Sequence, residues 1–404
     1  RDVTGVQTCA LPICDPYADF SVGGALAYGW YAFFRNALPM LAISAVILAV
    51  NFVLGQVIPQ NGALNTIIAF NVIGTVISLL LLCPANCQEP LRIAGKTMGS
   101  YYSIVIDSAA PPAAAPLQQQ IETVFADLNR QMSTWDQNSE ISRFNQAVDS
   151  TEWFPVSRDF ATVTSEARRL HTLTSGALEI TLAPLIEAWG FGRSRKKRIP
   201  PDAEIAAALQ LQGTQFIEVR DAPPAIRRTR PGIQISLNAL APGYAADRIS
   251  ELLRERGLKS HVVDVGGENR AGAAKRSGEP WRLGVESPLG NLHKILELTE
   301  KSIATSGDYR NFFVIDGQRF SHVLDPRTGR PVADPPASVS VTHASCMTAD
   351  GLATAMMVLG SEKGLQLAKQ AGFDVMFLNV DSSGKLVEQS SGQFASTPTS
   401  TDPR

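Results

Sequence analysis

Hydrophobic and polar positions divide the chain into two regions of different character. No Asp, Glu, Lys or Arg lies between Arg35 and Glu89, a gap about long enough for two membrane spans. Within it, residues 37–58 predict a transmembrane helix by their length and lack of charge, and residues 66–82 predict a second, shorter one. The second run also has the size of the hydrophobic region of a secretory signal. Residues 15–90 are therefore expected to form membrane-embedded segments or a signal- or lipoprotein-type anchor.

The sequence leaves the topology of this hydrophobic region open. Two spans with the N-terminus inside would return the following domain to the cytoplasm, whereas one span or a signal anchor would export it. Arg35 is the only charge near the first span, too little for the positive-inside rule to decide. Cys83 and Cys87 follow the second run without the small-residue context of a bacterial lipobox, so lipid attachment at either cysteine also stays open.

From residue 91 onward the pattern becomes that of a folded domain. Short apolar runs predict strands at residues 101–106, 261–265, 281–285, 295–298, 311–315 and 338–341. Apolar residues at helical spacing predict helices at residues 117–132, 159–174, 243–256 and 352–359. Strands and helices alternate without a strict βαβ rhythm, which predicts an α+β domain of mixed sheet and helix layers over residues 91–389.

The two ends of the chain lie outside this predicted domain. Residues 1–14 show no periodicity and resemble translated sequencing-adapter read-through, so we interpret them as a sequencing or assembly scar. Residues 390–404 are rich in Ser, Thr and Pro, which predicts a disordered tail.

Composition narrows the possible function classes only a little. The 404 residues carry a net charge of −2, so nothing in the charge points to nucleic acid and no nucleic-acid partner is predicted. The five cysteines form neither a metal-binding quartet nor a disulfide framework. Cys346, the only cysteine after residue 91, is expected to be a small buried apolar residue.

Residues 302–360 carry the side chains with the most evident chemistry. Asp350 and Thr354 are four apart in a predicted helix, so their oxygens fall on one face. A carboxylate and a hydroxyl presented together suit Mg²⁺, which prefers oxygen ligands. The same residues also fit a structural role, with Thr348 as N-cap and Asp350 in the first turn of the helix. His322 likewise fits either a structural or a catalytic role.

Eight sequence blocks, in chain order, closely resemble the ApbE family, the FAD:protein FMN transferases. The blocks are KTMGS (96–100), MSTWDQNSEISRFN (132–145), PLIEAWGFG (184–192), NALAPGYAAD (238–247), DVGGENR (264–270), ATSGDYRNFF (304–313), FSHVLDPRTGRP (320–331) and MTADGLATAMMVLG (347–360). The resemblance covers residues 91–387 and implies an ApbE-like, T-fold-like α+β domain.

The resemblance also implies an activity. Enzymes of this family depend on Mg²⁺ and bind FAD as substrate. They pass FMN to a Thr or Ser hydroxyl of a target protein, and AMP leaves. They are usually exported, often lipid-anchored, and flavinylate subunits of membrane redox complexes. We therefore expect FAD and an acceptor protein as partners. We also expect attachment through the N-terminal segment to the bacterial inner membrane, with the folded domain in the periplasm.

Three groups of site residues follow from the resemblance. The expected metal ligands are the backbone carbonyl of Ala239 and the side chains of Asp350 and Thr354. The positions expected to contact FAD are Met98, Trp135, Ala177, Leu178, Glu179, Ser236, Pro242 and Leu324. The residues expected to steer the acceptor hydroxyl or the phosphate are His322, Asp325 and Asp308.

Four positions depart from the family's pattern. Ser236 stands where an acid is usual, and Pro242 replaces a lysine with a residue that has neither charge nor backbone N–H. Glu179 replaces an aspartate, and Ala353 stands where some members have a second metal-directed aspartate. Two alternatives to FMN transfer therefore stay open: Mg²⁺-dependent hydrolysis of FAD to FMN and AMP, and a membrane-tethered flavin-binding protein without turnover.

Overall fold

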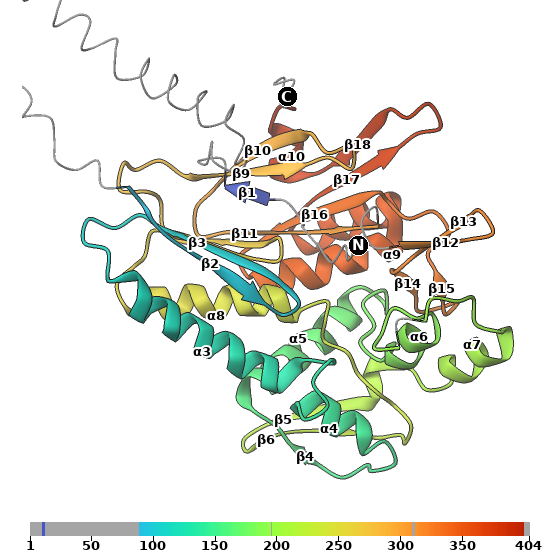
Figure 1. The fold of residues 1–404 in the computed structure, drawn as a ribbon. Helices are drawn as coiled ribbons and strands as arrows, with labels where there is room; N and C mark the ends of the chain where they lie inside the picture. The colour runs from blue at the N-terminus through green and yellow to red at the C-terminus, as the bar shows by residue number, and fades with distance from the viewer. Residues whose placement is uncertain (1–9, 13–88, 195, 309–311, 400–404) are drawn as a thin grey trace, which may run out of the picture. The chain divides into compact units, whose positions relative to one another are not determined.

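The central element of the fold is an eight-stranded sheet in which every neighbouring pair is antiparallel (Figure 1). The computed structural model describes residues 10–12, 89–194, 196–308 and 312–399. In spatial order the strands are β18 (Leu386–Ser390), β17 (Asp374–Val380), β16 (Ser338–His343), β11 (Ser302–Gly307), β8 (Glu268–Ala271), β7 (His261–Val265), β3 (Ser100–Ile106) and β2 (Leu91–Thr97).

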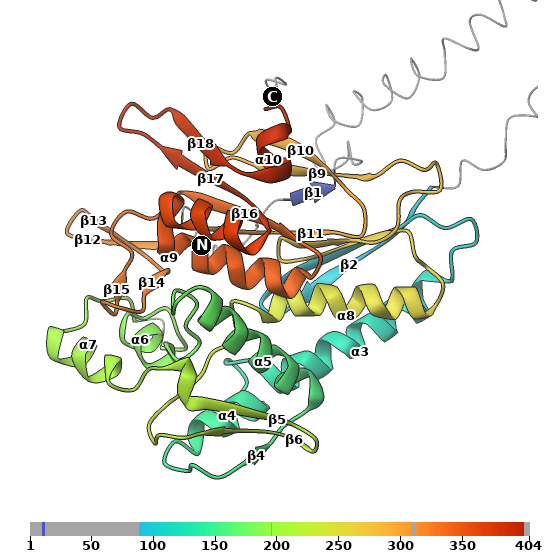
Figure 2. The same ribbon diagram turned by 180° about the vertical axis from the view of Figure 1, so that it is seen from behind.

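Three helices cover one face of this sheet (Figures 1 and 2). They are α3 (Ala114–Met132), α8 (Ala241–Glu255) and α9 (Cys346–Ala371). Alternate residues of β3 follow the strand period, so Tyr102, Ile104 and Ile106 face the main core while Val105 faces a second core on the other side. Because both faces are covered, all five residues of β7 are buried.

A smaller sheet covers the opposite face of the central sheet. Its strands are β1 (Ala10–Pro12), β9 (Trp281–Glu286) and β10 (Leu292–Leu298). The core between the two sheets contains Val105, Val262, Leu283 and Phe394, the last from α10 (Gly392–Ser396). The prediction of a disordered tail from residue 390 is therefore wrong for the part of the tail that the structure describes, because Phe394 is fully buried and anchors α10.

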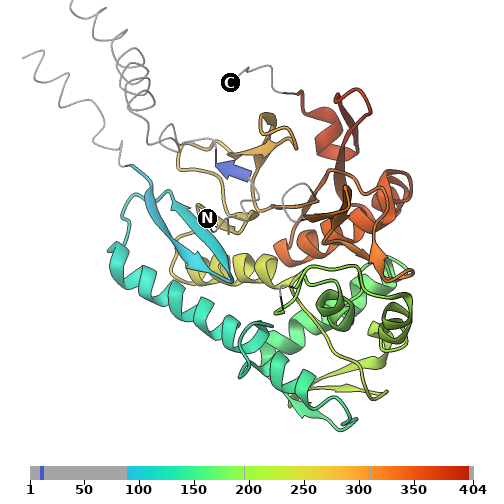
Figure 3. The ribbon, with the colours of Figure 1, turned by 45° about the vertical axis from the view of Figure 1, so that its right-hand side comes forward.

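The remaining elements form a helical part with a small sheet, the green region of Figure 3. They are α4 (Glu140–Gln146), β4 (Phe154–Pro155), α5 (Arg158–Leu173), α6 (Ala183–Ala188), α7 (Asp202–Leu209), β5 (Ile217–Asp221) and β6 (Pro224–Arg228). Two hairpins lie close to α6, β12–β13 (Phe312–Ile315, Gln318–Ser321) and β14–β15 (Leu324–Asp325, Arg330–Pro331). Trp189, just after α6, donates from Nε1 to the carbonyl of Gly329 at 2.9 Å and so joins the second hairpin to this part.

The elements predicted from hydrophobic periodicity are confirmed in type, and so is the α+β class. Their ends shift by at most three residues, except that the helix predicted at residues 352–359 is part of the longer α9 (Cys346–Ala371). One start was wrong: α9 begins at Cys346, because Ser345 rather than Thr348 is the N-cap and accepts the Thr348 N–H at 3.2 Å. Asp350 therefore lies beyond the first turn. Among the described residues no helix is both long and apolar enough to cross a membrane. The two predicted spans, residues 37–58 and 66–82, lie outside the described residues.

Candidate active site

A cavity of about 400 Å³ lies where the central sheet meets α8, α9 and the helical part. Its wall is built from short pieces of many elements, so residues far apart in the sequence meet there. These pieces are residues 98–100, 177–182, 236–242, 265–268, 305–307 and 322–324, together with side chains of α9. At the first piece, Gly99 has a φ of +73°, a conformation that suits glycine and makes the tight β2–β3 turn.

Two buried carboxylates, those of Asp350 and Glu268, line this cavity. Asp350 is 5% exposed and Glu268 8% exposed. Burial raises the pKa of both groups well above the ordinary values, and the charge of Asp350 raises that of Glu268 further. Within the described part of the chain, no Lys, Arg or His forms an ion pair with either carboxylate. The two buried carboxyl groups thus have no positively charged partner among the described side chains.

Asp350 is held in place by the start of α8. The backbone N–H of Gly243 donates to its Oδ2 at 3.0 Å, and this bond lowers the pKa of Asp350 partly against the effect of burial. A Cβ at Gly243 would lie 2.5 Å from the carbonyl oxygen of Cys346 and 2.8 Å from Cβ of Asp350. Only glycine lets the two helices approach this closely.

Another carboxylate, that of Asp247 on α8, fixes the start of α9. It accepts hydrogen bonds from the Ser345 hydroxyl at 2.8 Å and from the backbone N–H groups of Cys346 and Met347 at 3.0 Å each. Negative charge at a helix N-terminus is also favoured by the helix dipole. The position of Asp350 is therefore determined from two sides.

All three residues expected to bind a metal meet at this cavity. Ala239, Asp350 and Thr354 line it, and the Thr354 hydroxyl lies 3.4 Å from that of Ser306 on β11. No group of three or more His, Cys, Asp or Glu side chains able to hold a metal occurs among the described residues. The available donors are instead carboxylates, hydroxyls and a carbonyl, a set that suits a hard cation such as Mg²⁺.

Most residues expected to contact FAD also line the cavity. They are Met98, Ala177, Leu178, Glu179, Ser236, Pro242 and Leu324. Pro242 lies in the first turn of α8, so this turn presents one N–H fewer to the cavity.

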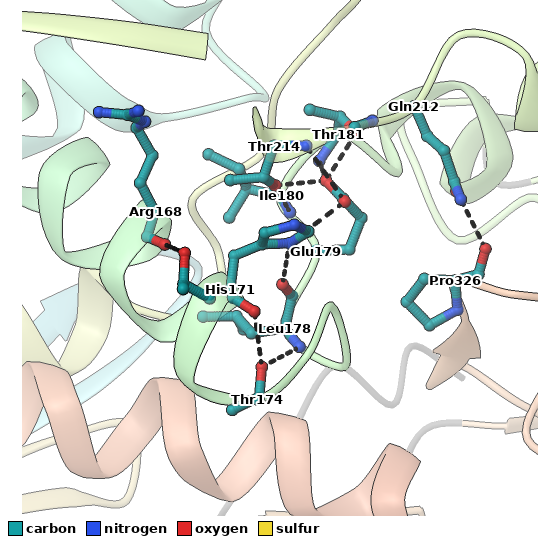
Figure 4. A network of polar contacts seen from close by, with 12 residues as sticks. Arg168, His171, Thr174, Leu178, Glu179, Ile180, Thr181, Gln212, Thr214 and Pro326 are labelled. Carbon is teal, nitrogen blue, oxygen red and sulfur yellow. Dashed lines mark hydrogen bonds and ion pairs between the residues drawn. The ribbon is translucent and has the colours of Figure 1, made fainter. Parts of the chain in front are cut away.

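The Glu179 carboxylate is held by hydrogen bonds at the wall of the cavity. Figure 4 shows it inside a local network, where it accepts from the hydroxyl of Thr181 at 2.6 Å and from the hydroxyl of Thr214. It also lies 3.4 Å from Nδ1 of His171 and is only 4% exposed. The longer carboxylate thus fixes the loop around residue 179, while the residue also lines the main cavity as expected.

Trp135 lies outside the main cavity. It is 52% exposed, so it is not part of a hydrophobic core. It lines a neighbouring cavity of about 450 Å³ that shares Ile186, Ser236 and Asn238 with the main one. About half of its surface is therefore exposed beside this neighbouring cavity.

The three residues expected to steer the reacting groups are not brought together. His322 lines the cavity, with its ring 6.3 Å from that of Phe191 in an edge-on arrangement. Asp325 and Asp308 do not line it. Each of these two carboxylates has an arginine partner, and their expected role at the reacting atoms stays a prediction.

The Asp325 carboxylate closes the turn between β14 and β15. It accepts from the Arg327 backbone N–H at 2.9 Å and from the Arg327 guanidinium at 2.7 and 2.9 Å. Burial raises the pKa of Asp325, but these bonds outweigh burial and leave the pKa below its ordinary value. The Asp308 carboxylate pairs with Arg319 at 3.3 Å, and burial raises its pKa despite that positive charge.

Sequence reasoning missed Glu268 as a site residue. The available signal was the DVGGENR block, in which an acid follows a Gly-Gly turn directly after a buried strand. What the sequence did not reveal is that the fold places Glu268 in the cavity that Asp350 lines, where the charge of Asp350 acts on it.

Comparisons with known proteins agree on one family. A family model described as the ApbE family matches residues 98–377. A curated FAD:protein FMN transferase of Vibrio cholerae is 39% identical over 309 residues, covering 74% of this chain and 91% of the relative. The Escherichia coli K12 protein of the same name is 31% identical, covering 72% and 85%.

Solved structures give the same result. The flavin transferase ApbE from Vibrio cholerae is 37% identical with a TM-score of 0.70, covering 76% of this chain and 99% of that one. The apo form of the Pseudomonas stutzeri flavinyl transferase ApbE is 35% identical with a TM-score of 0.70, covering 76% and 96%. The mixed α+β architecture described above is therefore shared with these two enzymes.

Proposed function

The chain belongs to the ApbE family, and we propose that it binds FAD in the main cavity and transfers the FMN part to an acceptor protein. The oxygen of an acceptor Thr or Ser hydroxyl forms a bond to the FMN phosphorus. The bond from that phosphorus to the bridging oxygen breaks, and AMP leaves with this oxygen. The observation that carries the proposal is the pair of buried carboxylates that faces a largely apolar cavity beside hydroxyl groups.

The cavity fits the two chemical halves of such a substrate. Met98, Leu178 and Leu324 provide an apolar surface for a planar ring, and Met adapts its shape well to such rings. The neighbouring cavity with Trp135 adjoins this surface through shared residues, which gives a dinucleotide room on both sides of its phosphates. Aromatic stacking on an exposed tryptophan tolerates many ring types.

The donor set also fits a divalent cation. We propose Asp350, Thr354 and the backbone carbonyl of Ala239 as the residues that hold Mg²⁺. When bound, Mg²⁺ lowers the free energy of the negative charge that develops on the phosphates. The protein's own contribution is to orient the buried Asp350 carboxylate through the Gly243 N–H, a bond that also favours its ionised form.

His322 is our candidate for accepting the proton of the acceptor hydroxyl. It is the one of the three expected steering residues that lines the cavity. Histidine is suited to this step because its ordinary pKa allows it to take up a proton near neutral pH. The proton is then held on the imidazole when the new ester bond has formed.

The acceptor and the location belong to the same proposal. We propose a subunit of a membrane redox complex as acceptor, and the periplasmic side of the bacterial inner membrane as the place of action. Both rest on the family resemblance and on the hydropathy of residues 37–58 and 66–82. A lipid anchor at Cys83 or Cys87 would serve the same purpose as a membrane span.

The direct test uses the full-length enzyme in detergent with FAD, Mg²⁺ and a threonine-containing acceptor domain from a flavinylated redox subunit. We expect AMP release together with a fluorescent, FMN-sized mass increase on the acceptor. AMP without labelling of any acceptor threonine or serine would instead identify FAD hydrolysis. Bound FAD with neither product would identify a flavin-binding protein without turnover.

A further inference from the structure

Glu268 occupies a distinctive place at the start of β8. It follows the Gly266–Gly267 turn, in which Gly266 has a φ of +68° and Gly267 a φ of +112°. A Cβ at Gly266 would lie 3.4 Å from Oε2 of Glu268, so the side chain folds back over the turn. It lines the main cavity while being more than nine-tenths buried.

The described side chains offer Glu268 no compensating charge. The nearest cation along its strand, Arg270, lies beside Asp247 at 3.8 Å and Glu300 at 3.9 Å. Within the described ranges no ion pair reaches Glu268, whereas the negative charges of Asp350 and Asp264 are close enough to act on it. Two unbalanced carboxylates in one buried site cost free energy, and this cost is removed when a cation binds between them.

Helix α9 supplies one carboxylate to this site. Ala353, three residues after Asp350, is fully buried and has no oxygen in its side chain. A second carboxylate therefore has to come from another element, and Glu268 on β8 is the one that the fold brings to Asp350. Its side chain points into the cavity that Asp350 and Thr354 also line.

We propose that Glu268 is a further ligand of the cation site, so that carboxylates from β8 and α9 together hold one divalent, oxygen-preferring cation. Two carboxylates balance the charge of such a cation, which selects it over monovalent ions. The inference rests on the proposed function, since it adds a ligand to the same site. The competing arrangement is a single proton shared by the two carboxylates, which would also remove one negative charge.

The experiment measures Mg²⁺ binding to the full-length enzyme by isothermal titration calorimetry, without FAD. We compare the natural chain with Glu268→Gln, Asp350→Asn and a control, Glu362→Gln, which removes an exposed acid of α9 that lies outside the cavity. We expect the natural chain and the control to bind alike. We expect Glu268→Gln to weaken Mg²⁺ binding by about 10- to 100-fold, the range known for groups that support a metal site.

Thermal unfolding provides a second readout. In EDTA, Glu268→Gln is expected to unfold at the same or a higher temperature than the natural chain, because one of two repelling charges is removed. With Mg²⁺ the order is expected to reverse, because ligand binding stabilises the folded state. If Glu268→Gln does not fold, Glu268→Asp keeps the charge but shortens the side chain, and its Mg²⁺ affinity is expected to fall.

The outcomes separate this inference from the proposed function. Natural Mg²⁺ affinity in both Glu268 variants, with binding lost in Asp350→Asn, would overturn the role of Glu268 and leave the cation site in place. If Asp350→Asn also binds Mg²⁺ with the affinity of the natural chain, the proposed cation site itself is contradicted. No Mg²⁺ binding in the natural chain, with Glu268→Gln more stable in every buffer, would favour the shared proton.

Discussion

The backbone N–H of Gly243 donates a 3.0 Å hydrogen bond to Oδ2 of Asp350, and this contact joins the start of α8 to the face of α9 that lines the main cavity. It explains how a buried carboxylate keeps a fixed direction in a cavity that opens to the substrate. It also explains the glycine at position 243, because any larger residue meets the backbone of Cys346 and the side chain of Asp350.

Gly243→Ala is therefore expected to damage both stability and activity. The new methyl group would lie 2.5 Å from the Cys346 carbonyl oxygen, so α8 and α9 must move apart. We expect a loss of about 1–3 kcal/mol in the free energy of unfolding. Urea unfolding measures this loss, and AMP release measures the displacement of Asp350. A variant with natural stability and turnover would show that the helices separate without cost.

Trp135→Ala is expected to change FAD affinity but not stability. The side chain is half exposed, so its removal leaves no cavity in the core. If the ring stacks on the substrate, FAD binding weakens by about 1–3 kcal/mol. Fluorescence titration with FAD measures this change, and an unchanged affinity would show that the neighbouring cavity is not part of the FAD site.

His322→Gln is expected to lower kcat while leaving FAD affinity nearly unchanged. Glutamine retains hydrogen-bonding capacity but cannot take up the proton of the acceptor hydroxyl. Loss of a general base typically lowers the rate by about 10²- to 10⁴-fold. Single-turnover labelling of the acceptor provides the rate, and FAD titration provides the control. A loss of FAD affinity with unchanged kcat would instead identify His322 as a substrate contact.

The pH dependence of stability is expected to include the buried His261. Its Nδ1 lies 2.7 Å from the carbonyl oxygen of Leu258 and its Nε2 lies 2.8 Å from the Ser250 hydroxyl. A carbonyl only accepts, so Nδ1 donates to Leu258, and in the neutral ring Nε2 accepts from the Ser250 hydroxyl. Burial lowers the pKa of His261 from 6.5 to about 4, and the nearby charges of Arg254 and Arg270 act in the same direction.

The sign of this effect follows from proton binding. Between pH 6.5 and about pH 4 the unfolded chain takes up a proton at this residue and the folded chain does not. The stability that the neutral ring provides is therefore complete above pH 6.5. It decreases as the pH is lowered towards about 4, by up to about 3 kcal/mol. Urea unfolding across this range measures it. In His261→Gln this part of the pH dependence should disappear, and an unchanged slope would contradict the assignment.

Much of the fold was predictable because its elements follow simple periodicity. The buried strand at residues 261–265 and the helix at 117–132 were placed correctly, since alternation and helical spacing report directly on burial. The structure of the tail was not predicted, because its Ser- and Thr-rich composition is typical of disordered segments. Its one aromatic residue, Phe394, is nevertheless buried in the second core.

The residues of the site were predictable only from helical spacing and from the family resemblance. Spacing in a helix placed Asp350 and Thr354 on one face, and the structure puts both at the cavity. Side-chain direction was not visible in the sequence, so the hydrogen bonds of the Glu179 carboxylate to Thr181 and Thr214 could not be predicted. Glu268 was not predicted as a site residue, because its place in the same cavity as Asp350 depends on how β8 and α9 pack in the fold.

The most direct test of the proposed activity compares the natural full-length enzyme with Asp350→Asn and with the control Glu362→Gln. AMP and covalently bound flavin are measured in the same reaction with FAD, Mg²⁺ and acceptor. We predict equal amounts of AMP and labelled acceptor for the natural enzyme and the control, all lost when EDTA is added. Asp350→Asn is predicted to remain folded and to give neither product. Undiminished, Mg²⁺-stimulated transfer by Asp350→Asn would contradict the account.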